Sequence, residues 1–556
     1  MVGRRLLRWC CASLMLAGLA LSPAGAAPAP VRLGDDDRLL VLAPHPNDET
    51  LAAGGLIQEA AALGLPVRVC YFSMGDNNEI AYLFTRHHPV DTPGAMRSQG
   101  ARRLNEAIAA ARQLGLATND VVFLGYPDSC TLDVWNGHWR TVPPLQSMLT
   151  RAHAVPYAQA LTPGSAYAGE DVLDDLAEVV RDFRPTLLVM PHPADHNVDH
   201  RALALFARVA LWHLEADGIR PEILAAPVHF TDWPRPRRAA PERPAVPPAF
   251  LEGQIEWREY ALAPFQATNK LAALRRHHSQ YGAAAAYLDS FVRKTELFGN
   301  FADLALPNGA GNLDVPEEDV SQFRPDQNFF AELASQSEQW NAIADQSAAE
   351  SRQLGGRDND FIGRTVSGDG THLTVSFQFL QPVSPSAVLV ATLFGYRPDV
   401  PFGEMPKLAI ETTPRGIVSV KDLDARLPAD AVEWVPDGDD EIKLRVSLAL
   451  LGNPGKILAG AQLLDGRLPV DWVPWRIVDL ALPAAVPARA PTEPPAAEST
   501  RMPEAAGEQP APPAPPNVAR PPAPTSETPT FPPPPVAPPA KPAPPPISEA
   551  DEPVYW

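Results

Sequence analysis

Two short segments of the chain gather side chains that can bind metal ions and move protons. Residues 43–49 read Ala-Pro-His-Pro-Asn-Asp-Glu, so that His45 and Asp48 stand three positions apart. An imidazole and a carboxylate at this spacing can face one ion if the segment forms a turn that opens a helix. Residues 192–200 hold three histidines and two aspartates. This concentration of ligand types predicts a metal site built from both segments.

The elements around these segments indicate how they come together. Short apolar runs precede them at residues 39–42 and 186–190, and helical patterns follow them. Across residues 37–300 such segments alternate, which predicts a Rossmann-like α/β domain with helices on both sides of a parallel sheet. Ligands bind at the carboxyl ends of such strands, so both segments fall on one rim. Two imidazoles and one carboxylate with an open fourth position suit catalytic zinc, which lowers the pKa of a bound water to about 7.

The second half of the chain has a different pattern of apolar and polar residues. Residues 357–482 contain stretches in which apolar and polar residues alternate, at 372–379 and 443–450, with Gly and Pro turns between them. This period of two predicts an antiparallel β-sandwich. The mixed, polar residues 301–356 are expected to form a connector with some helix.

Both ends of the chain carry signals of their own. Three arginines, an apolar run and a small-x-small motif predict a signal peptide over residues 1–26, hence a secreted or periplasmic protein, with an uncleaved anchor as the alternative. Residues 484–556 are rich in Pro, Ala and Glu. We expect them to be disordered, either as a spacer or as a tether to the cell envelope.

Charge and hydropathy exclude some partners. The 556 residues carry a formal net charge of −20, which repels the phosphate backbones of nucleic acids. After residue 26 no segment is apolar and long enough to span a membrane, which takes about 20 apolar residues. We therefore expect no nucleic-acid partner and no membrane span in the mature chain.

Five segments follow one ordered pattern, at residues 45–49, 103–106, 123–128, 199–202 and 270–280. The first reads His-Pro-Asn-Asp-Glu and the fourth reads Asp-His-Arg-Ala. In this order the chain resembles the PIG-L/LmbE-like zinc-dependent de-N-acetylases, which remove acetyl groups from N-acetylglucosamine conjugates and related amides. The resemblance covers residues 37–300. It implies an LmbE-like fold, Zn²⁺ as the cofactor and an N-acetylated sugar or polysaccharide as the substrate.

The resemblance also assigns the metal ligands and raises a question about the proton acceptor. His45, Asp48 and His200 match the family's His/Asp/His metal triad. The family's general base is the first aspartate of its His-Pro-Asp-Asp-Glu motif, and this chain has Asn47 there. A neutral amide cannot take a proton from water at ordinary pH, although it can orient that water. The alternative bases are nearby carboxylates, namely Glu49, Asp195 and Asp199.

Further roles fall on residues outside the triad. Arg103 resembles a substrate-contacting arginine of the family, and Asp128 is placed to bind a sugar hydroxyl. His196 could contact the substrate or stabilise a tetrahedral oxyanion. His278 could serve as the acid or as the oxyanion stabiliser, although the neighbouring His277 leaves the register open. The competing interpretations are structural: a solvated helix arginine, a turn-forming aspartate and loop histidines.

Two functions stay open at this point. The first is an exported zinc-dependent amidohydrolase that removes N-acetyl groups from a sugar or glycan-like substrate and releases acetate. The second is a non-catalytic glycan-binding protein of the cell surface that retains a degraded zinc site. Asn47 is the residue that keeps both open, because general-base catalysis is worth about 10²–10⁴ in rate and its loss need not abolish turnover.

Overall fold

The computed structural model covers most of both predicted domains. The described residues are 28–77, 92–230, 233–248, 251, 255–315, 361–379, 382–436, 438, 440–465 and 468–481. The predicted signal peptide and the Pro-rich tail lie outside them. Among these residues, no helix combines the length and the apolar character that crossing a membrane requires.

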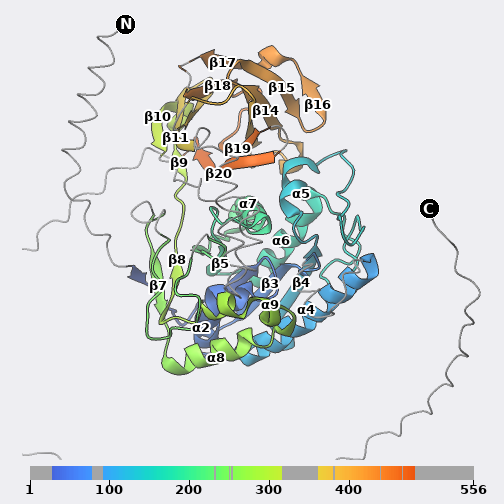
Figure 1. The fold of residues 1–556 in the computed structure, drawn as a ribbon, viewed down its shortest axis with the longest axis vertical. Helices are drawn as coiled ribbons and strands as arrows, with labels where there is room; N and C mark the ends of the chain where they lie inside the picture. The colour runs from blue at the N-terminus through green and yellow to red at the C-terminus, as the bar shows by residue number, and fades with distance from the viewer. Residues whose placement is uncertain are drawn as a thin grey trace, which may run out of the picture. The chain divides into compact units, whose positions relative to one another are not determined.

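A five-stranded parallel sheet forms the centre of the α/β part, in the order β4-β3-β2-β5-β6 (Figure 1). Its strands are β2 (Leu39–Ala43), β3 (Val67–Ser73), β4 (Val121–Tyr126), β5 (Leu187–Pro191) and β6 (Glu222–Ala226). β2 and β5 are buried along their whole length, which explains their continuous apolar sequence. The strand order runs outward from β2 in both directions, so the switch point lies between β2 and β5. The predicted α/β fold is confirmed.

Helices cover both faces of this sheet (Figure 1). One group comprises α2 (Asp48–Ala62), α4 (Pro93–Gln113), α8 (Pro264–Leu274) and α9 (His278–Asp289), which pack on one another. The other group comprises α5 (Thr131–Gly137), α6 (Gly169–Phe183) and α7 (Val198–Leu214). A small sheet lies against α2 and consists of β1 (Ala29–Pro30), β7 (Arg258–Ala261) and β8 (Thr295–Phe298).

The C-terminal part is built from two largely antiparallel sheets that share one apolar core. The first sheet has the order β10-β11-β12-β18-β17, with β10 (Ala310–Val315), β11 (Phe361–Asp369), β12 (His372–Phe379), β18 (Glu441–Ser447) and β17 (Val432–Pro436). The second has the order β16-β15-β14-β13-β19-β20-β9, with β16 (Ala425–Leu427), β15 (Gly416–Asp422), β14 (Lys407–Thr413), β13 (Ala387–Tyr396), β19 (Lys456–Asp465), β20 (Leu468–Asp479) and β9 (Leu304–Ala305). Burial alternates along β18, as the period of two in the sequence predicts.

Strands β9 and β10 differ from expectation. They fall within residues 301–356, which we expected to form a connector, yet β10 pairs with β11 and β9 pairs with β20. Both strands are short or interrupted by turn residues, so their sequence carries little alternation. Residues 316–356 of the expected connector lie outside the described residues.

The apolar core of the α/β part continues into the β-sandwich. Trp135 of α5 is fully buried, and its ring centre lies 5.5 Å from that of Phe402 and 5.6 Å from that of Phe394. Trp475 of β20 meets the same indole edge-on at 6.0 Å. Arg140 adds polar contacts, because its guanidinium donates hydrogen bonds to both carboxylate oxygens of Asp422. The apolar cluster of the α/β part therefore includes side chains of the β-sandwich, whose two sheets also enclose a separate cluster of their own.

Candidate metal and catalytic site

His45, Asp48 and His200 converge at the carboxyl end of the parallel sheet. His45 follows β2, Asp48 is the first residue of α2, and His200 lies in the first turn of α7 after β5. Asp48 Oδ2 lies 3.1 Å from His45 Nδ1 and 3.1 Å from His200 Nε2. All three side chains are buried. The structure thus brings together the three residues predicted as metal ligands.

Local backbone features place these ligands. Asn47 has φ 122°, a positive value that asparagine tolerates better than most residues, and it turns the chain sharply into Asp48. At the start of α7, the Asn197 side chain accepts hydrogen bonds from the backbone N–H groups of Asp199 (2.8 Å) and His200 (3.4 Å). This cap satisfies two N–H groups that have no partner inside the helix, and so fixes the turn that carries His200.

A second layer of carboxylates orients the two imidazoles. Asp199 Oδ2 lies 3.0 Å from His45 Nε2, and Asp195 Oδ2 lies 3.1 Å from His200 Nδ1. If a cation were bound, these contacts would keep the outer nitrogen of each ring next to a carboxylate and would leave His45 Nδ1 and His200 Nε2 free to bind the cation. Backbone N–H groups anchor the carboxylates, those of Ser129 and Thr131 for Asp199 and those of Val228 and His229 for Asp195.

The donor set fits a divalent cation such as zinc. One nitrogen of each of two imidazoles lies 3.1 Å from the same Asp48 carboxylate oxygen, and two imidazoles with one carboxylate are a ligand set that zinc commonly uses. Asp48 Oδ1 is buried, and within the described part of the chain it has no hydrogen-bond partner. Burial opposes ionisation of Asp48, but the imidazoles of His200 and His45 hold the pKa of this carboxyl well below its usual range. The site therefore presents a buried carboxylate with an unused oxygen, which a cation would complete.

His229 is a fourth member of this cluster that the sequence patterns did not reveal. It follows β6 on the same rim, and one of its ring nitrogens lies within 4.8 Å of ligand atoms of the triad. Its ring centre is 4.7 Å from that of His200. Burial, together with the charge of His200, lowers the pKa of His229 to about 4. The only sequence signal was a lone histidine in Pro-Val-His-Phe after an apolar run, which is weak by itself.

The three carboxylates that we considered as substitutes for the family's base all have hydrogen-bond partners in the structure. Glu49 accepts hydrogen bonds from the backbone N–H of Asn47 (2.9 Å) and from Thr50 Oγ1, and it lies 3.2 Å from His277 Nε2. Asp199 also accepts from Thr131 Oγ1 (2.5 Å). Asp195 receives three backbone N–H groups, those of Asn197, Val228 and His229. Each of these carboxylates therefore supports the backbone or an imidazole.

Arg103 and Asp128, predicted to contact substrate, lie next to the metal cluster and are buried. The Arg103 guanidinium donates to the carbonyl oxygens of Gly75 (2.8 Å) and Pro46 (3.0 Å), so it joins the loops that follow β3 and β2. Asp128 Oδ1 lies 3.3 Å from His45 Nε2. Burial opposes its ionisation, but His45 and Arg103 hold the pKa of Asp128 below its usual range.

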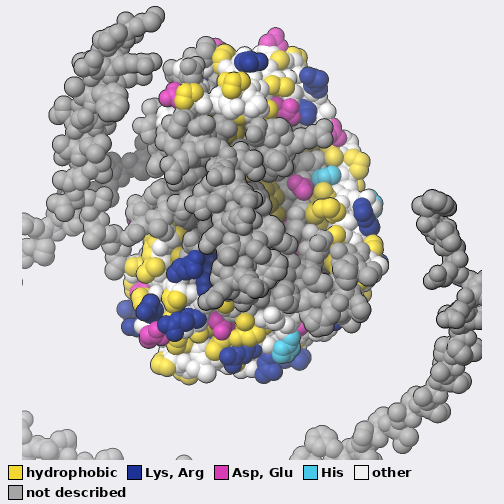
Figure 2. Space-filling model, in the orientation of Figure 1, with side chains coloured by type: hydrophobic (Ala, Val, Ile, Leu, Met, Phe, Trp, Pro, Cys, Tyr) yellow, Lys and Arg dark blue, Asp and Glu magenta, His cyan; other side chains and the backbone are white. Residues whose placement is uncertain are grey.

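His196 and His278 lie away from the metal cluster. His196 is buried, with its ring centre 5.2 Å from that of Phe230 and 6.2 Å from that of Trp472. Burial lowers its pKa to about 3. His278 is exposed at the start of α9, where it lines a shallow cleft with Arg102 and Arg276. Figure 2 shows Lys and Arg side chains gathered along the lower edge of this face of the molecule.

The neighbouring His277 points the other way. It is buried at the N-terminus of α9, with Nε2 3.2 Å from Glu49 Oε1. Of the two adjacent histidines, His277 is therefore the one that reaches the His-Pro-Asn-Asp-Glu segment. The register that the sequence left open is set by the packing of α9 on α4, since Ser279 donates its backbone N–H to Glu106 of α4 (3.0 Å).

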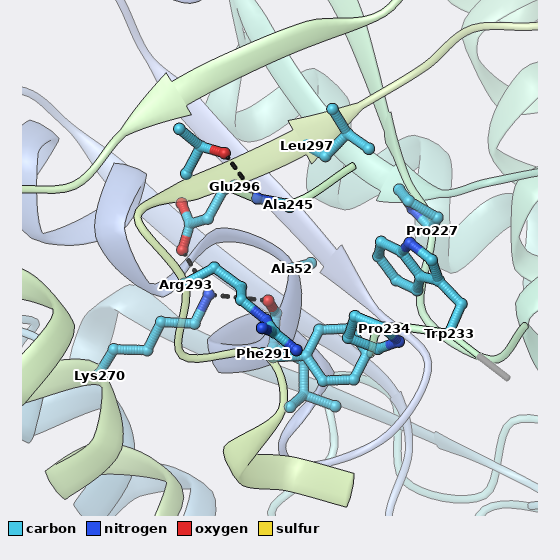
Figure 3. Close-up of a pocket in the computed structure, with 12 residues that line it drawn as sticks. Ala52, Pro227, Trp233, Pro234, Ala245, Lys270, Phe291, Arg293, Glu296 and Leu297 are labelled. Atoms are coloured by element: carbon cyan, nitrogen blue, oxygen red, sulfur yellow. Dashed lines mark hydrogen bonds and ion pairs between the residues drawn. The ribbon is translucent and has the colours of Figure 1, made fainter. Parts of the chain in front are cut away.

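A buried ion pair supports the helix that carries Asp48. Helix α2 is kinked at Ala53 (φ −141°, ψ 20°), which frees backbone groups on both sides of the kink. Lys270 Nζ donates to the carbonyl of Leu51 (2.9 Å) and to Glu296 Oε1 (2.7 Å) (Figure 3). Glu296 in turn accepts from the N–H groups of Gly55 and Leu56. The pair lies beside a cavity of about 20 Å³, room for about one water molecule.

Comparison with known proteins shows which family and which proteins the α/β part is similar to. The family described as "PIG-L: GlcNAc-PI de-N-acetylase" matches residues 40–211. A 1D-myo-inositol 2-acetamido-2-deoxy-alpha-D-glucopyranoside deacetylase 1 from Saccharopolyspora erythraea is 30% identical over 258 residues, which are 44% of this chain and 77% of that protein. The corresponding deacetylase from Actinosynnema mirum is 28% identical over 255 residues, 44% of this chain and 80% of that protein.

Solved structures are similar at lower identity. The N,N'-diacetylchitobiose deacetylase from Pyrococcus horikoshii is 17% identical, with a TM-score of 0.30, and the match covers 48% of this chain and 83% of that one. The A40926 pseudoaglycone deacetylase Dbv21 is 15% identical, with a TM-score of 0.31, covering 47% of this chain and 96% of that one.

Proposed function

The chain belongs to the PIG-L family of de-N-acetylases, and from this premise we propose that it is an exported, zinc-dependent hydrolase that removes N-acetyl groups from a substrate containing N-acetylglucosamine. The observation that carries the proposal is the convergence of two buried imidazoles on one buried carboxylate at the ligand-binding rim of the sheet. The relatives from S. erythraea and A. mirum are deacetylases of an acetamido-glucopyranoside of inositol, which supports an acetamido sugar as the substrate class.

The proposed export of the protein and its proposed location are based on the sequences at the two ends of the chain. The signal peptide predicted at residues 1–26 supports a secreted or periplasmic location, and the Pro-rich residues 484–556 support a tether to the envelope. Fractionation of cells that produce the full-length chain, with and without residues 2–26, tests this part. A cytoplasmic wild-type chain would contradict it.

The residues of the site have separate tasks in the proposed hydrolysis. His45, Asp48 and His200 would hold the zinc, which when bound polarises a carbonyl and lowers the pKa of water. Asp199 and Asp195 keep the two imidazoles in the orientation that binding requires. Water adds to the acetamide carbonyl carbon, the C–N bond breaks, and acetate and a free amine leave. Asn47 precedes Asp48 in the chain, and its neutral amide could orient water but could not accept its proton.

The test is acetate release from a panel of N-acetylated sugars by the purified chain, with and without a chelator. We expect turnover that the chelator abolishes and added zinc restores, stoichiometric zinc by elemental analysis, and loss of both in His45→Ala. His372→Ala is the matched control, because this histidine lies on β12 of the β-sandwich. A chain that carries no zinc, or a His45→Ala variant that behaves like wild type, would contradict the proposal.

Glycan binding without turnover is the second candidate, and Asn47 is the observation that favours it. It predicts that the wild-type chain binds an N-acetylated glycan in calorimetric titration and releases no acetate. Asn47→Asp separates the two candidates, because aspartate also tolerates a positive φ and supplies the missing carboxylate. A large gain in acetate release from this variant favours a slow enzyme, whereas unchanged binding without release favours a binding protein.

A further inference from the structure

A cleft of about 520 Å³ lies between helix α4 and the junction of α8 with α9. These three helices pack on one another (Figure 1). On α4 the lining residues recur at helical spacing from Ser98 to Ala109, and so share one face of the helix. Arg276 and His278 line the cleft from the junction. Ligand-binding clefts in proteins commonly measure about 300–1,000 Å³, so this one is large enough for a small polar ligand.

The side chains around the cleft are mainly basic, although the whole chain carries a net charge of −20. Arg102 and Arg276 supply two guanidinium groups, and Glu106 is the one acid among the lining residues. Glu106 is buried, and both of its carboxylate oxygens accept hydrogen bonds from Ser279, one from the backbone N–H (3.0 Å) and one from the hydroxyl (2.6 Å). The two guanidiniums are therefore the charges that the cleft offers to a ligand.

These side chains keep donors and acceptors available. Arg102 is half-buried, and among the described residues it makes no hydrogen bond or ion pair. Arg276 is exposed and donates to Gln113 Oε1 (2.8 Å), which leaves other N–H groups of its guanidinium for a ligand. Asn105 spends its amide nitrogen on the Ala101 carbonyl (2.9 Å) and keeps its side-chain oxygen as an acceptor. Guanidiniums bind carboxylates and phosphates through paired N–H groups, and an amide oxygen binds a hydroxyl, so this set suits an acidic sugar.

The helix segments that line the cleft also support the metal-site loop. Arg103, next to Arg102, donates to the carbonyl oxygen of Pro46 (3.0 Å). His277, next to His278, has its Nε2 3.2 Å from Glu49 Oε1. A glycan whose acetamido sugar binds at the metal site would thus find a second binding place on the same two helices.

We propose that this cleft binds an acidic group, a carboxylate or a phosphate, of a glycan whose acetamido sugar occupies the metal site. The inference rests on the proposed function and narrows its substrate to anionic N-acetylated glycans. Arg102 and Arg276 bind the anion, and Asn105 accepts a hydrogen bond from a neighbouring hydroxyl. The cleft takes no part in breaking the C–N bond, so it acts on KM rather than on kcat.

The first test measures acetate release by the full-length chain from three kinds of oligosaccharide that contain N-acetylglucosamine. One kind is neutral, one also contains glucuronic acid, and one also carries a sugar phosphate. We expect kcat/KM to be about 10-fold higher for one of the acidic kinds than for the neutral kind, through a lower KM, because hydrogen bonds to charged groups are the stronger ones. The preferred kind tells carboxylate from phosphate. The preference should shrink as salt is added, because the charges are near solvent.

Variants of the two arginines locate the effect. Arg102→Gln/Arg276→Gln should raise the KM for the acidic substrate about 10-fold, to the KM of the neutral one. Arg276→Glu, at an exposed position, should raise it at least as much, since it repels the anion. Arg112→Gln is the matched control, because Arg112 lies on the same helix outside the cleft and donates to Thr118 Oγ1 (2.7 Å). Zinc content shows whether each variant keeps the metal site intact.

Calorimetric titration tests the cleft without turnover. Glucuronic acid and glucose 6-phosphate are the probes, and the His45→Ala background keeps them from binding a metal ion at the proposed zinc site. We expect one of the two probes to bind in this background and in His45→Ala/Arg112→Gln, and to lose its binding when Arg102 and Arg276 are both replaced by Gln.

The outcomes separate this inference from the proposed function. If no substrate releases acetate, the proposed function is overturned, and the titration alone then decides whether the cleft binds an acidic sugar. With an active wild type, equal kcat/KM for neutral and acidic substrates overturns the inference alone. A synthetic peptide of residues 545–556, which contains Glu549, Asp551 and Glu552, is the competitor. Tighter binding of this peptide than of either sugar probe would overturn a glycan as the occupant of the cleft.

Discussion

The Arg201 guanidinium lies 4.0 Å from the centre of the Trp472 indole. Arg201 follows His200, the proposed metal ligand, on α7, and Trp472 belongs to β20 of the β-sandwich. The same indole meets the His196 ring edge-on at 6.2 Å. Burial lowers the pKa of Arg201 to about 10, so the guanidinium stays cationic at neutral pH and can attract the indole face. The β-sandwich thus contacts the helix turn that carries His200.

Replacing Trp472 should therefore weaken both stability and the metal site. We expect Trp472→Ala to lower the free energy of unfolding by about 3–5 kcal/mol, because it removes a large buried side chain. It should also lower zinc content, since the start of α7 loses a neighbour. Denaturant unfolding and elemental analysis measure the two effects. Trp434→Ala on β17 is the control, and an equal loss of zinc from that variant would refute a specific role for Trp472.

Asp199 should control metal affinity without touching the metal. Asp199→Asn keeps the shape of the side chain but weakens the acceptor for His45 Nε2. We expect zinc affinity to drop by about 10- to 100-fold, measured by competition with a chromogenic chelator. Asp217→Asn, an exposed aspartate after α7, should leave the affinity unchanged. Wild-type affinity in Asp199→Asn would show that the orientation of His45 does not depend on this carboxylate.

The Lys270–Glu296 pair should be costly to break. Lys270→Met leaves the buried Glu296 charge and the Leu51 carbonyl without their partner, so we expect a loss of about 3–5 kcal/mol in unfolding free energy. Lys421→Met, which breaks the partly exposed pair with Glu411, should cost less than about 1 kcal/mol. Urea unfolding of the two variants makes the comparison, and equal losses would contradict the importance of burial.

Asp76 should make stability depend on pH. Burial and the nearby charge of Asp128 raise the pKa of Asp76 to about 7, above its usual value near 4 in an unfolded chain. The folded state then binds the proton more tightly, so this contribution to stability is present below about pH 4 and is lost as pH rises through about 7. Asp76→Asn should flatten that decline between about pH 4 and 7 in urea unfolding. The exposed Asp36→Asn should not, and an unaltered slope in Asp76→Asn would contradict the raised pKa.

Regular patterns in the sequence predicted many of the strands that the structure contains. The run at residues 372–379 coincides with β12, and the apolar runs at 39–42 and 186–190 fall on β2 and β5. Because parallel strands bring their carboxyl ends to one rim, the strand assignments alone were enough to predict that His45 lies near His200. These parts depend on local periodicity and on one topological rule, both of which a single sequence contains.

Other features depend on contacts between distant residues, and periodicity does not encode them. His229 joins the cluster through the order of strands in the sheet, and Tyr287 reaches it from another helix. The choice between His277 and His278 changes with a one-residue shift at a helix start. Trp135 meets Phe402 only because the two parts of the chain share a core. Sequence reasoning could propose such residue types but not their partners.

The core that Trp135 shares with Phe394 and Phe402 has a consequence for the history of the chain. An appended domain joined by a simple linker can be lost, swapped or clipped off without harm to its neighbour. Here a recombination or proteolytic event that separated the β-sandwich would open the hydrophobic interior of the α/β part to water. A chain that lost the β-sandwich by either route would need other side chains to cover Trp135.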